Sequence, residues 1–164
     1  MSVHRLLPQP QAYGHQLGLL LLDEVETHVP GDTAHAATYP FPVLFKVVEG
    51  ATAYRVTTGD SDVESSIVVA ALELEAAGVM GISSNCGFMV HYQRAVTKAL
   101  RIPAMLSSLL QLPMIAAAIG PQQTIGVVTA FVDRLGDNVL ALAGLSPDVN
   151  IAVTSIEHSD AQSI

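Results

Sequence analysis

Cysteine is almost absent from this sequence of 164 residues, and tryptophan is absent altogether. The single cysteine excludes an intramolecular disulfide framework and a zinc site built from several cysteines. Basic residues are also few, since seven lysines and arginines stand against 15 aspartates and glutamates, for a net charge of −8. This balance argues against a nucleic-acid partner, whose phosphates attract positive charge. The aromatic content of only 5% argues against base stacking as well.

Charged residues make up only 13% of the chain, whereas half of its residues are hydrophobic. This composition excludes intrinsic disorder, and the length suits about one domain. No charged residue lies between Ile102 and Val132, but Pro103, Pro113 and Pro121 interrupt this stretch. Because a membrane-spanning helix needs an unbroken apolar run, we expect no membrane segment here. The N-terminus lacks the apolar core of a signal peptide, so we expect a cytoplasmic protein.

Short runs rich in valine, isoleucine and leucine alternate with longer segments that suit helices. Residues 17–22 form an unbroken apolar run, which is typical of a strand buried on both faces. The pattern predicts further strands at 54–57, 79–82, 104–106, 124–130 and 150–153, and helices at 43–49, 61–77, 88–100, 109–119 and 135–143. Such alternation predicts an α/β fold with a mostly parallel sheet and helices on both faces.

The expected domain covers residues 17–154, with an N-terminal extension at 1–16 and a polar, frayed tail at 155–164. The helix at 61–77 has the clearest boundaries. Ser61 and Glu64 have capping-box spacing, and Asp60 is the alternative cap. Gly78 stands where a left-handed cap ends a helix.

Polar residues follow several expected strands, and ligands of open parallel sheets bind at the carboxyl ends of strands. These exits hold Asp23, residues 83–87, residues 107–108 and Thr129. Asp23 is either a functional acid or a solvated neighbour of other carboxylates.

Cys86 is the sharpest feature of these strand exits, because it stands between a buried strand and a helix start. A helix start lowers the pKa of a thiol, so we expect a pKa below the free value. Asn85 and Gly87 suit a tight turn whose amides bind a carboxylate. From the residues alone, a catalytic thiolate and a small buried cysteine both remain open.

The six histidines do not form a metal site, because none has further ligands at a suitable spacing. His28 and His35 lie in one long loop. His91 follows Cys86 by five residues and would point to another side of a helix. The glycines match no nucleotide-binding motif. We therefore expect neither a metal nor a cofactor.

The segment Ser-Ser-Asn-Cys-Gly-Phe at 83–88 resembles the aspartate/glutamate racemase superfamily, and hydantoin-racemase-like members in particular. Other matching segments are 17–23, 30–32, 39–43, 78–88, 107–111 and 125–130. The resemblance as a whole extends over about residues 17–154. The resemblance implies a flavodoxin-like racemase lobe, paired in the family with a second one, and a small amino acid or carboxylate as substrate.

Carried over by motif, the resemblance implies that Cys86 is the thiolate that moves a Cα proton. It implies that Asp23, Ser84, Asn85, Gly87 and Thr129 bind the substrate. The family uses a second cysteine on the opposite face of the substrate, and this sequence contains no cysteine besides Cys86. The second lobe is expected to be incomplete, so an opposing acid would have to come from another subunit, His28 or His35.

The function expected from the sequence is therefore a cofactor-independent amino-acid racemase or epimerase, inactive if truncation has removed its second acid. One alternative is a one-cysteine decarboxylase or cis–trans isomerase of small dicarboxylates, because these reactions need a single thiol. Another is a non-catalytic carboxylate-binding or interaction domain. An incomplete lobe would expose apolar surface, so we also expect a homo-oligomer.

Overall fold

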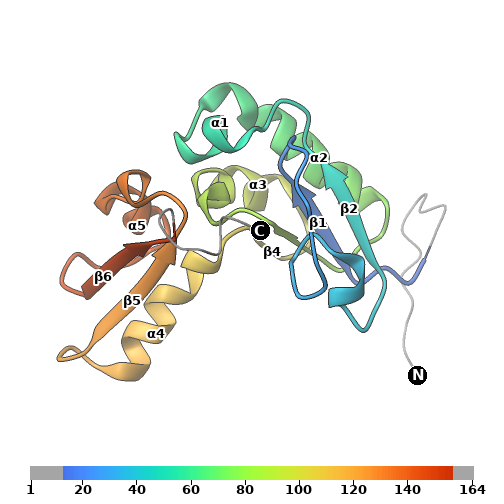
Figure 1. Ribbon diagram of the computed structural model, residues 1–164. Helices are drawn as coiled ribbons and strands as arrows, with labels where there is room; N and C mark the ends of the chain where they lie inside the picture. Colours follow the sequence, from blue (N-terminus) through green and yellow to red (C-terminus); the bar gives the residue numbers. More distant parts are fainter. Residues whose placement is uncertain (1–12, 157–164) are drawn as a thin grey trace. The chain divides into compact units, whose positions relative to one another are not determined.

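The computed structural model describes residues 13–156 (Figure 1). The chain divides into two compact units, Met1–Ser107 and Ser108–Ile164. The strands are parallel and helices flank them, so the predicted α/β fold is confirmed. Residues 1–12 of the expected extension and 157–164 of the expected tail lie outside the described residues. Ser155 of that tail is part of a regular strand.

The first unit contains a four-stranded parallel sheet in the order β2-β1-β3-β4. Its strands are β1 (Leu17–Leu21), β2 (Val43–Val47), β3 (Gly81–Ser84) and β4 (Ala104–Met105). Leu17 pairs with Val43 on one side and with Gly81 on the other, so the three strands begin at the same level, and β3 ends one residue before the other two. Their carboxyl ends therefore form one edge, at which the chain leaves each strand.

Helix α2 (Glu64–Ala76) packs on β1, β2 and β3 (Figure 1). Its buried residues are Ile67, Ala70, Ala71 and Leu74. An added Cβ at Gly18 would lie 3.0 Å from Leu74 Cδ1, so glycine in β1 allows α2 to approach closely. Helix α3 (Gln93–Ala99) packs against α2 and β4. The remaining helices of the unit are short: α1 (Ala53–Thr57), η1 (Ala36–Thr38), η2 (Ser61–Val63) and η3 (Gly87–Tyr92).

Of the two predicted N-terminal caps, Ser61 and Asp60, the structure confirms Asp60. Asp60 is the N-cap of η2 and its carboxylate accepts a hydrogen bond from the Asp62 N–H, directly ahead of α2. Gly78 follows α2 with a φ of 88°, a conformation that favours glycine and ends the helix as predicted.

Three sequence predictions were wrong. Residues 43–49 were expected to form a helix but contain β2, because the register with β1 satisfies their backbone. Residues 54–57 were expected to form a strand but belong to α1, whose N-cap Thr52 accepts a hydrogen bond from Arg55 N–H at 3.4 Å. The expected helix at 88–100 is divided into η3 and α3.

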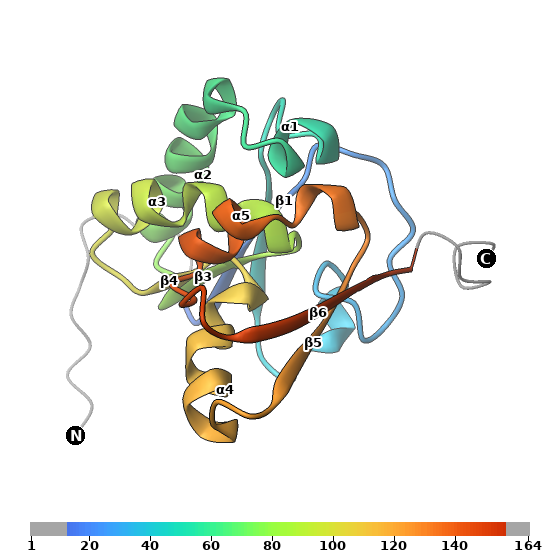
Figure 2. The ribbon, with the colours of Figure 1, turned by 90° about the vertical axis from the view of Figure 1, so that its left-hand side faces the viewer.

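The second unit contains the two-stranded parallel sheet of β5 (Thr124–Thr129) and β6 (Asn150–Ser155), which run side by side in Figure 2. Its helices are η4 (Ser108–Gln111), α4 (Leu112–Ile119), η5 (Val132–Arg134) and α5 (Asp137–Leu142). The sequence predicted one sheet for the chain, whereas β5 and β6 form a sheet of their own. No helix between residues 13 and 156 has the length and apolarity needed to cross a membrane.

Candidate functional site

Cys86 lies two residues beyond β3, at the carboxyl edge of the first sheet, where the chain turns into η3. Its backbone is extended, with φ −126° and ψ 121°, and its carbonyl accepts the Met89 N–H at 3.0 Å to begin the helical turn. The side chain is half-buried and is a free thiol. The predicted location of this cysteine at a strand exit is therefore confirmed.

Asn85 joins the exit of β3 to the exit of β1. Its N–H donates to the Leu20 carbonyl, and its Oδ1 accepts the Leu22 N–H, both at 3.2 Å. These two bonds continue the pairing of the strands for one residue beyond the sheet. Asn85 therefore fixes the loop after β1 next to Cys86.

The Ser84 hydroxyl positions Cys86 through a hydrogen bond to its backbone. Its Oγ accepts the Cys86 N–H at 3.3 Å and donates to the Leu106 carbonyl at 2.6 Å, and the residue is buried. Ser107 adds a second tie, because its Oγ donates to the Gly87 carbonyl at 2.5 Å. These bonds are internal to the protein, and they hold the cysteine turn to the segment after β4. Substrate binding by Ser84 and Gly87 stays a prediction.

Asp23 follows β1 and binds the exit of β2. Its Oδ2 accepts the Gly50 N–H at 2.8 Å, while its own N–H donates to the Ala51 carbonyl at 3.1 Å. The side chain is exposed. Asp23 thus connects two strand exits, and its contact with substrate stays a prediction.

Thr129 belongs to the second unit, where it ends β5 as predicted. Its Oγ1 accepts the Phe131 N–H at 3.4 Å. Thr129 shares no sheet with Cys86, so the expectation that both would lie at the edge of one sheet was wrong.

The pKa of the Cys86 thiol is raised, so the prediction of a lowered pKa was wrong. Burial is the largest cause, because it disfavours the charged thiolate. The backbone N–H groups of Phe88 and Met89 act in the opposite direction but do not outweigh burial. The carboxylates of Glu24 and Glu26 raise the pKa further. The free thiol is therefore mostly protonated at neutral pH.

The histidines make local interactions. His28 Nδ1 lies 3.1 Å from Asp32 Oδ2, and His35 Nδ1 accepts the Ala37 N–H at 3.1 Å. The His91 ring packs against Gly59, its Nε2 is buried without a hydrogen-bond partner, and burial lowers its pKa. Within the described residues, no group of three or more histidine, cysteine or acidic side chains is placed to hold a metal ion.

Sequence reasoning missed residues that the structure associates with the site. Gln93 bridges α3 and the β4 exit, since its Nε2 donates to the Ala104 carbonyl and its Oε1 accepts the Leu106 N–H, both at 2.8 Å. Glu24 and Glu26 act electrostatically on Cys86. The signal for these two acids was their position directly after a predicted strand, where Asp23 alone was considered.

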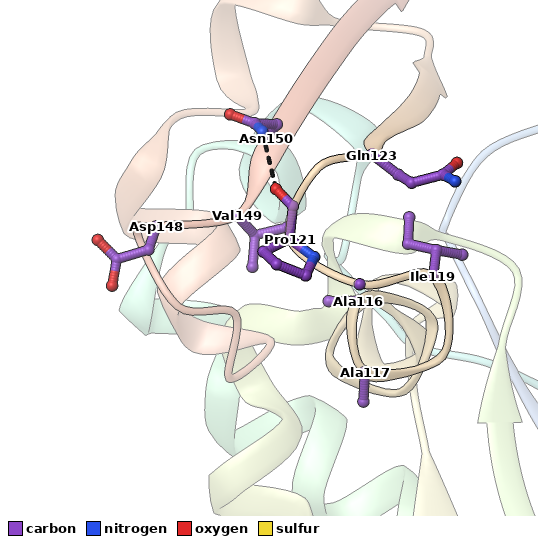
Figure 3. Close-up of a pocket in the computed structure, with 9 residues that line it drawn as sticks. Ala116, Ala117, Ile119, Pro121, Gln123, Asp148, Val149 and Asn150 are labelled. Atoms are coloured by element: carbon purple, nitrogen blue, oxygen red, sulfur yellow. Dashed lines mark hydrogen bonds between the residues drawn. The ribbon is translucent and has the colours of Figure 1, made fainter.

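A shallow pocket of about 320 Å³ lies in the second unit, between the end of α4 and the start of β6 (Figure 3). Asn150 Nδ2 donates to the Pro121 carbonyl across it at 3.4 Å. Asn150 is the first residue of β6, so the pocket lies at the amino ends of the strands. Ligands of parallel sheets bind at the opposite ends, and this pocket contains none of the predicted site residues.

Several curated proteins are similar to this chain in sequence, whereas no family model matches it. Dimethylsulfoniopropionate lyase 3 from Emiliania huxleyi (strain CCMP1516) is 31% identical over 116 residues, which are 70% of this chain and 30% of that protein. A dimethylsulfoniopropionate lyase from Durusdinium sp. clade D is 30% identical over 123 residues, covering 73% of this chain and 41% of that protein. The chain thus spans about a third of the length of the curated relatives it matches.

Two solved structures resemble the fold. Unliganded arylmalonate decarboxylase has a TM-score of 0.54 at 15% sequence identity, over 90% of this chain and 64% of that one. An aspartate racemase homologue from Pyrococcus horikoshii OT3 has a TM-score of 0.48 at 12% identity, over 90% and 67% of the two chains. The α/β fold implied by the racemase resemblance is therefore confirmed by the likeness to arylmalonate decarboxylase. The hydantoin-racemase-like subtype stays a prediction.

The names of the sequence relatives correct the function expected from the sequence. They are lyases, whereas the sequence led us to expect an amino-acid racemase, with a decarboxylase or isomerase and a non-catalytic domain as alternatives. The relatives are enzymes, so the expectation of an enzyme family holds at this coarser level. The error has a physical origin, because one fold can position a thiol for several reactions at a carbon next to a carboxylate.

Proposed function

We propose that this chain carries the catalytic thiol of a lyase that cleaves dimethylsulfoniopropionate, with Cys86 as the base. The observation that carries the proposal is the similarity of 116 residues, at 31% identity, to a protein of that name. Cys86 stands at an exit of the sheet, and its thiol becomes a proton acceptor once it is ionised. Since the chain spans about a third of those relatives, the activity of the whole protein is part of the proposal.

The proposed reaction is a β-elimination. The Cys86 thiolate takes a proton from Cα, next to the substrate carboxylate, and the electrons of that C–H bond form the new double bond. The C–S bond breaks and its electron pair leaves with sulfur. The products are neutral dimethyl sulfide and acrylate, and the proton on the thiol passes to water, which restores the base.

This chemistry needs fewer proton-transfer groups than racemisation does. A racemase must remove a proton from one face of Cα and deliver another to the opposite face, which requires two acid–base groups. Elimination ends in a planar alkene, so no proton returns to Cα and one base suffices. The Cys86 thiol alone can therefore supply the base that an elimination needs.

The substrate carboxylate needs hydrogen-bond donors close to the thiol. We propose Asn85 and Gly87 for this role, because both flank Cys86 in the turn between β3 and η3. Ser84 and Asp23 contribute indirectly, since their side chains bind the backbone of the Cys86 turn and of the β2 exit. Thr129 lies in the second unit and has no part in this proposal. A small zwitterion is thus the proposed ligand, and no cofactor takes part.

The experiment is to incubate the purified chain with dimethylsulfoniopropionate and measure both products, dimethyl sulfide in the headspace and acrylate in solution. We expect equal amounts of both, formed faster than in buffer alone. In a parallel incubation in D₂O, aspartate and glutamate should gain no deuterium at Cα. A folded chain that releases no dimethyl sulfide above the buffer rate would overturn the proposal.

A further inference from the structure

Helix α3 lies next to β4 (Figure 1), and its first residue, Gln93, binds the edge of that strand that faces away from β3. The Gln93 Nε2 donates to the Ala104 carbonyl and its Oε1 accepts the Leu106 N–H, both at 2.8 Å. In a parallel sheet, a residue of a neighbouring strand makes this same pair of bonds to the two residues that flank its partner. The side-chain amide therefore takes the place of a further strand at this edge.

Leu106 is bound through both of its backbone groups. Its N–H binds Gln93, and its carbonyl accepts the Ser84 hydroxyl at 2.6 Å. Leu106 is fully buried, so no solvent is at hand to replace either partner. The Ser84 Oγ also accepts the Cys86 N–H at 3.3 Å. A continuous series of hydrogen bonds thus leads from the Gln93 side chain to the backbone of the thiol.

The stretch of chain that carries Cys86 is attached at both of its ends to the segment around β4. Ser84 provides the attachment before the cysteine, and Gln93 provides the one after η3. Between them, the Ser107 Oγ donates to the Gly87 carbonyl at 2.5 Å. Loss of the Gln93 attachment frees one end of this stretch, and the cysteine turn can then move away from β4.

We propose that Gln93 is a positioning residue for Cys86, because it fixes the Leu106 backbone through which Ser84 holds the cysteine turn. The inference rests on the proposed lyase function and deepens it. A base must lie at a fixed place relative to the C–H bond that it breaks, and small displacements slow such a step strongly. Gln93 acts on the thiol through the backbone alone.

The role requires a side chain with one donor and one acceptor at the same time. The Ala104 carbonyl can only accept and the Leu106 N–H can only donate, so these two partners fix the orientation of the Gln93 amide. Methionine has a similar length but lacks the N–H donor, and an ionised glutamate has acceptors only. Substitutions that keep the size of the side chain can therefore remove the attachment.

The first test follows the thiol in Gln93→Met. Its rate of reaction with neutral methyl methanethiosulfonate is measured against pH; the thiolate attacks the sulfenyl sulfur, forms a mixed disulfide and releases methanesulfinate. Burial is the largest cause of the raised pKa of Cys86, so a looser turn should lower this pKa and speed the reaction at neutral pH. In turnover of dimethylsulfoniopropionate, we expect kcat to fall about ten- to hundredfold and KM to change less.

The second variant, Gln93→Glu, makes the attachment depend on pH. A protonated carboxyl group has one donor and one acceptor, so it can bind Ala104 and Leu106 as the amide does. The ionised group has no donor, and its charge faces the Ala104 carbonyl. The attachment is thus present below the pKa of the new carboxyl group and lost above it. We expect the wild-type rate of thiol modification in acid, and a rate above that of the wild type once the carboxyl group is ionised.

The control is Thr97→Val, which removes a side-chain hydrogen bond within α3 and leaves the Gln93 side chain in place. The Thr97 Oγ1 donates to the Gln93 carbonyl at 2.9 Å. This variant should keep the thiol pKa and the kcat of the wild type. All proteins are compared at equal folded concentration, and Gln93→Glu decides if Gln93→Met does not fold.

The outcomes separate this inference from the lyase function. An unchanged thiol pKa in folded Gln93→Met, or a rate for Gln93→Glu that keeps the same ratio to the wild type at every pH, would overturn the inference. A lowered thiol pKa with wild-type kcat would overturn it as well, because turnover would not depend on this attachment. A wild type that releases no dimethyl sulfide loses the lyase function, and the thiol pKa of the variants still decides whether Gln93 positions Cys86.

Discussion

The Ser84 hydroxyl accepts a hydrogen bond from the Cys86 backbone N–H, at 3.3 Å, while it donates to the Leu106 carbonyl at 2.6 Å. The reactive turn is therefore attached to the segment after the neighbouring strand through one buried oxygen. Ser84 acts on the thiol through the backbone, which makes it a positioning residue.

Ser84→Ala should impair both stability and turnover. The variant leaves the Cys86 N–H and the Leu106 carbonyl without this partner, which costs about 1–3 kcal/mol in free energy of unfolding. Because the variant also displaces the thiol, we expect a larger fold-decrease in kcat than fold-increase in KM. The matched control is Ser83→Ala. In the wild type the Ser83 Oγ donates to the Met105 carbonyl at 2.8 Å and does not bind the cysteine turn. Equal kcat values for the two variants would contradict the positioning role.

Gly18→Ala should destabilise the first unit. The new Cβ would lie 3.0 Å from Leu74 Cδ1, so the Leu74 side chain must move by a few tenths of an ångström in a packed layer, and we expect a cost of about 1 kcal/mol. Gly126→Ala in β5 is the control, because an added Cβ there meets no atom within 4 Å. Urea denaturation should give a lower midpoint for Gly18→Ala alone, and a midpoint equal to that of the wild type would refute the close contact.

The pKa of Cys86 should fall when the nearby carboxylates are neutralised. Burial is the main cause of the raised pKa, and Glu24 and Glu26 raise it further. The double variant Glu24→Gln/Glu26→Gln should therefore have a thiol pKa that is lower than in the wild type but still above that of free cysteine. The pH dependence of modification by a neutral thiol reagent measures this shift. At a given neutral pH the variant should react faster than the wild type, and a slower reaction would show that the electrostatic assignment is wrong.

Tyr92 should cause a loss of stability at alkaline pH. Burial, with the Asp60 and Glu64 charges, raises its pKa from 10.0 to about 12, against the effect of Arg55. A raised pKa stabilises the fold below pH 10, and this contribution disappears as the pH rises through about 12.

Tyr92→Phe removes this titration together with the hydrogen bond from the Tyr92 hydroxyl to the Asp60 carbonyl, 2.9 Å long. We expect a cost of about 1 kcal/mol at neutral pH and a shallower decline above pH 10. Thermal unfolding of the wild type and the variant measures stability across this pH range. Equal losses of stability in the two proteins above pH 10 would contradict the assignment.

The sequence predicted the fold where burial and backbone preference agree. The apolar run that forms β1 could be recognised because a strand covered on both faces needs such residues throughout. The prediction failed at 43–49, whose residues suit a helix or a strand equally well. Only the pairing of β2 with β1, a contact between distant segments, decides the structure there.

The site was predicted in part for the same reason. The rule that ligands bind at strand exits located Cys86, Asn85 and Asp23. It did not give the pKa of the thiol, because burial depends on packing against the rest of the unit. Glu24 and Glu26 have the composition of a solvated loop, so nothing in the sequence indicated that they raise the pKa of Cys86.

The most direct test of Cys86 as the base is the initial rate of dimethyl sulfide release from dimethylsulfoniopropionate carrying hydrogen or deuterium at Cα. Wild type, Cys86→Ala and Cys86→Ser should be compared at equal folded concentration. We predict a slower wild-type reaction with the deuterated substrate, because the thiolate breaks that C–H bond, and no release above buffer by Cys86→Ala. Release by Cys86→Ala at the wild-type rate would contradict Cys86 as the base.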